Sequence, residues 1–243
     1  MISNIYHAIV YQPLYNGLIL LMDTIPWADA GVIVILFTVI VKLCLFPLSK
    51  KAVNTQMQMR AIEPELNLLK EKYKDDKQEL ARKTMELYKE NGVRPFMSIL
   101  LIFIQLPIIF ALYRVFLHSG LPIVNKDLLY GFIKIPEQIN MTFLGWVDIS
   151  KTSLVLAILV GVATFMQAKI MAPKISTNTV PDSEKDSFRH DFAKSMSLQM
   201  KYVFPFVAAF ISWKISAAIS LYWITSNLFT IGQELFLKRK IAK

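Results

Sequence analysis

Long apolar runs separated by short charged segments dominate the chain. The five candidate runs are Gly31–Leu48, Phe96–Tyr113, Thr152–Ala168, Tyr202–Trp213 and Ile215–Gln233. Lys42 is the single charge in the first run, and the fourth reaches spanning length when Lys201 and Lys214 are counted as interfacial anchors. Because a spanning helix needs roughly 20 mostly apolar residues, the pattern predicts five transmembrane helices.

The first 22 residues are also uncharged and form a possible sixth span. Pro13 and Gly17 interrupt this run. Polar or amphipathic groups recur near helical spacing at Asn4, Tyr11, Gln12, Tyr15 and Asn16. A helix with one polar face favours a position in the membrane interface over a position across the membrane, although the sixth span stays open as the alternative.

The loops between the runs alternate between many and few basic residues. Residues 1–30 hold no Lys or Arg, 49–95 hold eleven, 118–151 hold three, 173–201 hold five and 238–243 hold four. Because basic loops stay in the cytoplasm, this alternation predicts an external N-terminus and a cytoplasmic C-terminus. The expected order is an external interfacial helix (1–27), TM1 (28–49), a cytoplasmic helical hairpin (50–94), TM2 (95–117), an external loop (118–151), TM3 (152–172), a cytoplasmic loop (173–197), TM4 (198–214), TM5 (215–236) and a basic cytoplasmic tail (237–243).

The charged segment 50–94 has the signals of two short helices. Pro64 suits the first turn of a helix, and Asp76 followed by Glu79 is typical of a capping box. Gly92 suits the position after the second helix. The apolar seam is thin, so we expect this hairpin to depend on its neighbours and to be mobile.

Composition supports a membrane protein and excludes several other classes. The 243 residues carry a net charge of +9, 54% are hydrophobic, 19% are charged and the mean hydropathy is +0.43. These values argue against both a soluble domain and a disordered chain. Cys44 is the single cysteine, which excludes an internal disulfide, and no His or Cys spacing suits a metal. No Gly-rich nucleotide loop is present, so we expect neither a cofactor nor an enzyme.

Lys42 is costly inside the first span, and its position calls for an explanation. A lysine at mid-membrane costs about 2.5–3.5 kcal/mol on the insertion scale, and snorkelling toward the cytoplasm is one way to reduce that cost. Other polar residues of the spans favour a hydrophilic cavity nearer the cytoplasm, although each alone could simply join two helices. The candidates besides Lys42 are Thr38, Gln105, Gln167, Asn227, Thr230 and Gln233.

Several sequence strings, in order and on the expected elements, resemble the YidC family of membrane protein insertases. These are Tyr11–Asn16, Lys42–Ser49, Pro64–Glu65, Lys72–Lys74, Leu87–Pro95, Ile104–Ile108, Ala111–Tyr113, Leu221–Leu228 and Gln233. Each string is weak alone, but together they cover nearly the whole chain. The resemblance implies an all-α membrane protein whose five spans enclose a hydrophilic groove, open to the cytoplasm and to lipid and closed to the outside.

The resemblance also implies a function and a set of sites. The family inserts nascent membrane proteins, alone or beside the Sec translocon, often from a ribosome, and DNA is no partner. The charge of its groove is usually arginine, and here the position falls on Lys42, with Tyr222 and Trp223 as further groove residues. The recruitment hairpin would use Pro64, Glu65, Lys72, Tyr73, Lys74 and Tyr88. We expect a bacterial plasma membrane, because no organellar presequence is evident.

The basic end and the overall function each leave alternatives. Lys238, Arg239 and Lys240 could contact ribosomal RNA, but a positive anchor on the cytoplasmic side is favoured. A small-solute transporter or channel, in which Lys42 binds an anion, is a second function; the lack of inverted repeats argues against it. An assembly factor without insertase activity is a third.

Overall fold

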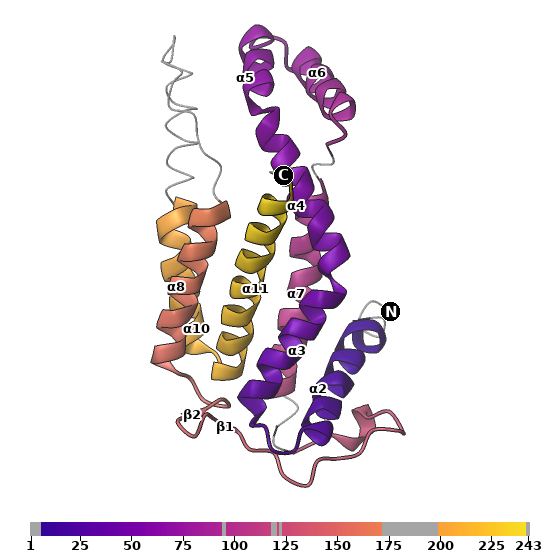
Figure 1. Cartoon of the computed structure of the whole chain (residues 1–243), viewed down its shortest axis with the longest axis vertical. Helices are drawn as coiled ribbons and strands as arrows, with labels where there is room; N and C mark the ends of the chain where they lie inside the picture. Colours follow the sequence, from indigo (N-terminus) through magenta and orange to yellow (C-terminus); the bar gives the residue numbers. More distant parts are fainter. Residues whose placement is uncertain (1–5, 94–95, 118–120, 122, 172–198, 242–243) are drawn as a thin grey trace. The chain divides into compact units, whose positions relative to one another are not determined.

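The computed structural model describes residues 6–93, 96–117, 121, 123–171 and 199–241 as a mostly helical chain (Figure 1). The helices fall into two compact units. One comprises 1–43 with 107–236, and the other comprises 44–106 with 237–243. The second half of α7 (Phe96–Leu117) and most of α11 (Ala217–Ile241) therefore belong to the first unit.

The first unit also holds two antiparallel strands and most of the apolar helices. Its other elements are η1 (His7–Tyr11), α2 (Gln12–Thr24), α3 (Ala30–Cys44), η2 (Lys126–Leu128), β1 (Thr142–Phe143), β2 (Val147–Asp148), α8 (Leu154–Met171), η3 (Gln199–Val203) and α10 (Phe204–Lys214). α10 ends at Lys214 and α11 begins at Ala217, close to the expected boundary between TM4 (198–214) and TM5 (215–236).

Small residues bring α8 and α10 close together. A methyl group at Gly161 of α8 would lie 3.0 Å from Ala209 Cβ and 3.3 Å from the Pro205 carbonyl oxygen of α10. The hydroxyls of Ser212 and Ser220 lie 2.7 Å apart and are buried, which joins α10 to α11. Close backbone approach at small residues and hydroxyl pairs are the ordinary means of helix association in lipid.

The segment that contains β1 and β2 and precedes α8 fixes the ends of two helices. We call residues 140–151 the clamp. The Ala30 N–H of α3 donates to the Asn140 carbonyl oxygen at 2.8 Å, and the Ala217 N–H of α11 donates to the Lys151 carbonyl oxygen at 2.7 Å. Asp29 accepts from the Val32 N–H of α3 and from the Leu144 N–H of the clamp. The clamp therefore satisfies helix N-terminal donors that would otherwise lack partners, and it holds α3 and α11 at one end.

The N-terminal helix differs from the prediction in what its polar residues do. We predicted that Asn16 and Tyr15 would lie on a polar face in the membrane interface, but both are buried. Asn16 Nδ2 donates to the Leu128 carbonyl oxygen at 2.8 Å, and Asn16 Oδ1 accepts from the Tyr130 N–H at 2.7 Å. Tyr15 Oη accepts from the Asn125 N–H at 2.8 Å, and burial raises the pKa of this phenol. These side chains hold the 125–130 loop against α2, because a buried amide or phenol needs such partners.

The predicted single span over 28–49 is interrupted. α3 ends at Cys44, and a new helix, α4 (Phe46–Ala61), begins after Leu45 with Pro47 in its first turn. Proline has no N–H to donate to the preceding turn and its ring crowds that turn, so it favours a helix start over a continuous helix. The predicted boundary between span and hairpin at residue 49 thus lies inside α4.

The second unit contains the helices of the charged segment, α4, α5 (Glu63–Lys72) and α6 (Lys77–Glu90). α5 and α6 contact each other around a small cluster of Ile62, Leu87 and Val93. No residue of α5 is buried and Leu87 is the one buried residue of α6, which agrees with the thin apolar seam predicted from the sequence.

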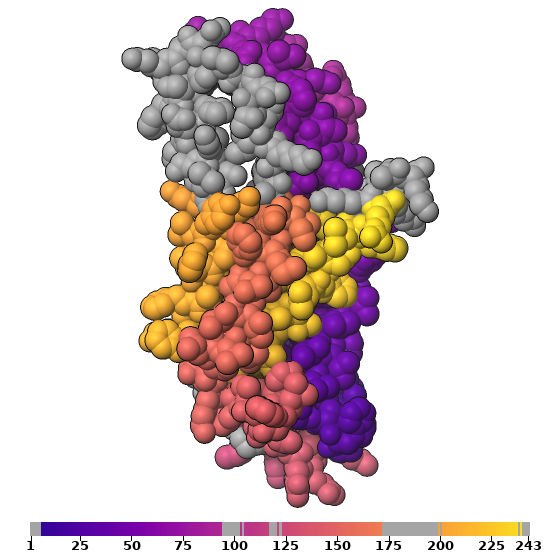
Figure 2. Space-filling view, turned by 60° about the vertical axis from the view of Figure 1, so that its left-hand side comes forward, coloured from indigo at the N-terminus to yellow at the C-terminus, as the bar shows by residue number. Residues whose placement is uncertain are grey.

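Among the described residues, α8 alone is a helix both long and apolar enough to cross a membrane. α3 and α4 would supply a second such segment if the broken pair were counted as one span. α10 has 11 residues, and the part of α7 with described side chains forms a shorter apolar helix, Gln105–Phe116. Five spans therefore remain a prediction from the sequence. The side chains of α8 and α10 form one continuous face of the first unit (Figure 2).

Candidate functional site

Lys42 of α3 meets Thr230 of α11 inside the first unit. The Lys42 Nζ donates a hydrogen bond to Thr230 Oγ1 at 3.5 Å. The Thr230 hydroxyl donates in turn to the Ser226 carbonyl oxygen, one turn earlier in α11, at 2.8 Å. The threonine oxygen is thereby oriented to accept from the ammonium. The structure thus brings together two of the predicted groove residues, which come from the two ends of the chain.

The clamp explains why these two residues meet. α3 and α11 both start at the clamp, so the distance of a residue from it follows from the rise of 1.5 Å per residue. Lys42 lies 12 residues beyond Ala30, about 18 Å along α3, and Thr230 lies 13 residues beyond Ala217, about 20 Å along α11. The two side chains consequently reach nearly the same level. A change at the clamp would shift one of them against the other.

Two neighbours extend this polar site along the helices. Thr38, one turn before Lys42, is fully buried and donates to the Val34 carbonyl oxygen of its own helix at 2.6 Å. Glu234, one turn after Thr230, has 1% of its surface exposed. Residues four apart lie on one helix face, so the face of α11 that meets Lys42 also carries an acidic group. We therefore include Glu234, which the sequence reading did not single out, in the candidate site.

Asn227 and Gln167 each form a hydrogen bond to a residue other than Lys42. Asn227 is buried, and its Nδ2 donates to Thr164 Oγ1 of α8 at 2.9 Å. This bond joins α8 to α11, which is the alternative that the sequence left open for single polar residues. Gln167 donates to the Met171 sulfur of its own helix at 3.5 Å. Their roles as groove residues stay predictions.

The remaining predicted groove residues are three residues of α11 and Gln105 of α7. Tyr222 and Gln233 of α11 are buried, and Trp223 is half-buried. Gln105 belongs to the second unit, whereas Lys42 and Thr230 belong to the first. The role of Gln105 as a groove residue therefore stays a prediction from the sequence.

The predicted recruitment residues occupy the ends of the short helices. Pro64 and Glu65 lie in the first turn of α5, as predicted. Lys72 ends α5 with its ammonium 5.4 Å from the ring centre of Tyr73, and Lys74 follows in the turn. Tyr88 contacts the small cluster around Leu87.

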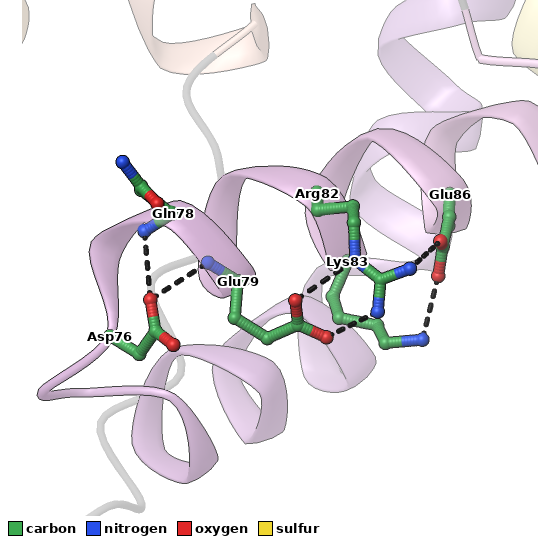
Figure 3. Close-up of polar contacts among 6 residues, drawn as sticks. All are labelled: Asp76, Gln78, Glu79, Arg82, Lys83 and Glu86. Atoms are coloured by element: carbon green, nitrogen blue, oxygen red, sulfur yellow. Dashed lines mark hydrogen bonds and ion pairs between the residues drawn. The ribbon is translucent and has the colours of Figure 1, made fainter.

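The start of α6 is fixed by a side-chain cap and an ion-pair chain (Figure 3). Asp76 accepts from the Gln78 N–H at 3.1 Å and the Glu79 N–H at 3.0 Å, which confirms the predicted N-cap. In a complete capping box, the Glu79 side chain would also accept a hydrogen bond from the Asp76 backbone N–H. Among these described residues, Glu79 pairs with Arg82 instead. The series of ion pairs continues from Arg82 to Glu86, whose charged atoms lie 3.2 Å apart. Arg82 lowers the pKa of Glu79, and Lys83 lowers the pKa of Glu86.

The basic end of the chain is helical. α11 continues to Ile241, so the predicted boundary between TM5 and the tail at residue 236 lies within a helix. Arg239 is exposed, whereas the side chains of Lys238 and Lys240 lie outside the described part of the structure. Ribosome contact by these residues stays a prediction.

The described residues include no group of three or more His, Cys, Asp or Glu side chains arranged to hold a metal ion. The cation of the candidate site is the Lys42 ammonium, which donates to the neutral Thr230 hydroxyl. Such a site can attract an anionic group and replace part of the water around a polar one.

Comparison with known proteins identifies the family. A family model described as "60Kd inner membrane protein" matches residues 21–243. The chain is 32% identical over 235 residues to the membrane protein insertase YidC of Fusobacterium nucleatum, which covers 96% of this chain and 98% of that protein. It is also 32% identical over 216 residues to the YidC of Clostridium tetani, with 89% and 84% covered.

A solved structure shows the same fold. The crystal structure of an active YidC insertase with its first transmembrane domain resolved superposes with a TM-score of 0.58 at 24% identity. The match covers 91% of this chain and 45% of that one. The family model, the two relatives and the fold agree with the resemblance that the sequence strings indicate. The chain therefore belongs to the 60Kd inner membrane protein family, the family of the YidC membrane protein insertases.

Proposed function

We propose that the chain inserts nascent membrane proteins through a hydrophilic groove whose charge is Lys42. The observation that carries this proposal is the hydrogen bond between Lys42 Nζ and Thr230 Oγ1. Thr230 is a neutral partner, so this hydrogen bond does not cancel the charge of a protonated Lys42 toward an approaching acidic group. Ion attraction at 4 Å is worth about 4 kcal/mol at an effective dielectric constant of 20.

The groove would act by lowering the cost of moving polar groups into the membrane. An unsatisfied polar group in lipid costs several kcal/mol, and Lys42 with its neighbouring oxygens would replace part of the lost hydration. The apolar helix of the substrate would then leave sideways into lipid, and its hydrophobic transfer would supply the free energy. For acidic tails that move outward, the membrane potential would add about 2.3 kcal/mol per charge per 100 mV. No nucleotide is needed.

The membrane arrangement is part of the proposal. Five spans, with the N-terminus outside and the C-terminus in the cytoplasm, follow from the apolar runs and the alternating Lys and Arg counts. The clamp would then lie at the external end, and α5 and α6 would lie in the cytoplasm of a bacterium. The ion pairs and exposed surface of α6 suit a helix in water that recruits a ribosome or a nascent chain, with the Sec translocon as a possible further partner.

The first test is insertion into proteoliposomes without ATP. The substrate is a short protein with one span and an acidic tail, and protease protection of the tail reports its translocation. We expect Lys42→Ala to reduce protection strongly and Lys42→Arg to retain it. Lys134→Ala is the matched control, because this lysine is exposed in the loop before β1. Unchanged insertion by Lys42→Ala would rule out the role of this charge, and anion leakage without insertion would favour a transporter.

The second test concerns recruitment. Deletion of 60–92 removes α5 and α6 and leaves every element of the first unit in place. We expect weaker binding of ribosome–nascent chain complexes and a folded membrane core by circular dichroism and gel filtration in detergent. Normal binding by the deletion variant would contradict a recruiting role, and binding to completed subunits alone would favour the assembly factor.

A further inference from the structure

Three of the four tryptophans lie at the clamp end of the first unit. Trp27 is in the turn before α3, Trp146 is at the tip of the clamp, and Trp213 is at the end of α10, just before α11. The hydrogen bonds of the clamp to the first residues of α3 and α11 place all three at this end. Trp27 is 84% exposed and Trp146 is 91% exposed, although indole is among the largest apolar side chains.

The backbone of the clamp presents its apolar tip at a conformational cost. Leu144 has a positive φ of 51°, and Gly145 follows with a φ of 76°. The left-handed region is unfavourable for a residue with a branched side chain, and such strain persists only where surrounding contacts impose it. Here the Asp29 carboxylate holds the Leu144 N–H at 3.1 Å, and the strained turn leaves Leu144 66% exposed beside Trp146.

The surroundings of the tryptophans favour a lipid interface as their partner. The clamp leads directly into α8, whose side chains Leu154, Val155 and Ile158 are exposed and apolar. α10, which ends at Trp213, exposes Phe206 and Phe210 in the same way. The Lys214 ammonium lies 4.3 Å from the centre of the Trp213 ring, so an aromatic group and a cation stand together where the apolar face ends. Such pairs are typical of the boundary between acyl chains and headgroups.

We propose that Trp27, Trp146 and Trp213 bind the headgroup region of one leaflet and thereby set the depth of Lys42 in the membrane. The clamp transmits this position rigidly, because it holds the first residues of α3 and α11 by hydrogen bonds. With the tryptophans at one interface, Lys42 lies about 18 Å along α3 from that end. In a hydrocarbon core of about 30 Å, this level is beyond the midplane and nearer the opposite interface.

The position of Trp146 can be measured directly. A variant with Trp27, Trp213 and Trp223 replaced by phenylalanine leaves one indole, and phosphatidylcholine vesicles brominated at different acyl depths quench it according to its depth. We expect the strongest quenching by the shallowest bromines and weak quenching by aqueous iodide. Strong iodide quenching with no bromolipid effect would overturn the proposal, as would strongest quenching by the deepest bromines. Because no substrate is present, this result is independent of insertase activity.

The effect of the tryptophans on the depth of Lys42 can be measured at Cys44, the single cysteine. This residue is exposed and lies two residues beyond Lys42. A nitroxide on Cys44 reports depth through its relative accessibility to oxygen and to a water-soluble nickel complex. We expect Trp27→Ala/Trp146→Ala to change the ratio of these accessibilities, and Trp27→Tyr/Trp146→Tyr to retain the parent value, because tyrosine also prefers the interface. An unchanged ratio in the alanine variant would overturn the depth-setting role.

Discussion

Lys42 Nζ lies 3.5 Å from Thr230 Oγ1, and the two residues stand at nearly equal distances from the clamp that starts both of their helices. A lysine in a lipid-facing position would have to extend toward water to reduce its cost. Here the ammonium instead has a hydroxyl partner on a neighbouring helix. This geometry favours an internal polar site over snorkelling, the alternative that the sequence alone could not exclude.

The first prediction concerns that hydroxyl. Thr230→Val keeps the shape of the side chain and removes the acceptor of Lys42, so we expect less precise placement of the ammonium. Insertion of an acidic-tailed substrate should fall about threefold, which corresponds to the ~0.6 kcal/mol typical of a hydrogen bond between membrane helices. Thr230→Ser keeps the hydroxyl and should retain activity. Equal activity of the valine and serine variants would contradict the positioning role of Thr230.

The second prediction separates stability from function at Asn227. Its amide donates to Thr164 at 2.9 Å in a buried position, so Asn227→Leu should lower the free energy of unfolding in detergent by about 0.5–2 kcal/mol. The Asn227→Leu/Thr164→Val pair should be less destabilised than the sum of the two single variants, because both partners are then apolar. Insertion by folded protein should stay near the parent level. A strong loss of insertion without loss of stability would instead place Asn227 in the groove.

The third prediction concerns acid and the ion pairs of α6. Arg82 and Lys83 lower the pKa values of Glu79 and Glu86 below that of an unfolded glutamate, about 4.3. The resulting stabilisation of α6 is therefore complete above that pH and is lost as the pH falls through the lowered values. After correction for intrinsic rates, amide exchange in α6 should be faster at pH 3 than at pH 6. The difference should shrink in high salt and in Glu79→Gln, because these pairs lie at the surface, where salt screens them. Equal protection of the α6 amides at both pH values would contradict this prediction.

Local chemistry made several elements of the fold predictable from the sequence. Pro64, Asp76 and Gly92 each act through their own backbone neighbourhood, and the structure places them at a helix start, an N-cap and a turn with a φ of 64°. The boundary after Lys214 was predictable from the two apolar runs that meet there. Pro47 carried an equally strong signal, but the apolar run around it favoured a continuous span, and the helix breaks there at Leu45.

The candidate site was only partly predictable, because its formation depends on contacts between distant residues. Lys42 was evident as a charge in an apolar run, whereas its partner among the polar residues of α11 depends on the level at which the clamp holds both helices. Asn16 was wrongly assigned to a surface face, since its partners lie more than 100 residues away in the 125–130 loop. Glu234 could have been found by its spacing of four residues from Thr230.

The last prediction tests the clamp itself through Gly31 and Phe143. The Phe143 ring of β1 lies against Gly31 in the first turn of α3, so closely that a methyl group on Gly31 would overlap the ring. Gly31→Ala should therefore force the clamp away from α3 and cost about 1–3 kcal/mol, the usual range for an overpacked contact. Phe143→Ala removes Cγ and the ring carbons, which include the two atoms nearest to that methyl group, so Gly31→Ala should cost less thermal stability in the Phe143→Ala background than in the parent. Gly161→Ala is a useful comparison, because its close neighbours are in α10 and replacing Phe143 should not rescue it. If Phe143→Ala reduced the cost of both glycine variants equally, or if Gly31→Ala unfolded at the parent temperature, the clamp would not hold α3 in the way that its hydrogen bonds indicate.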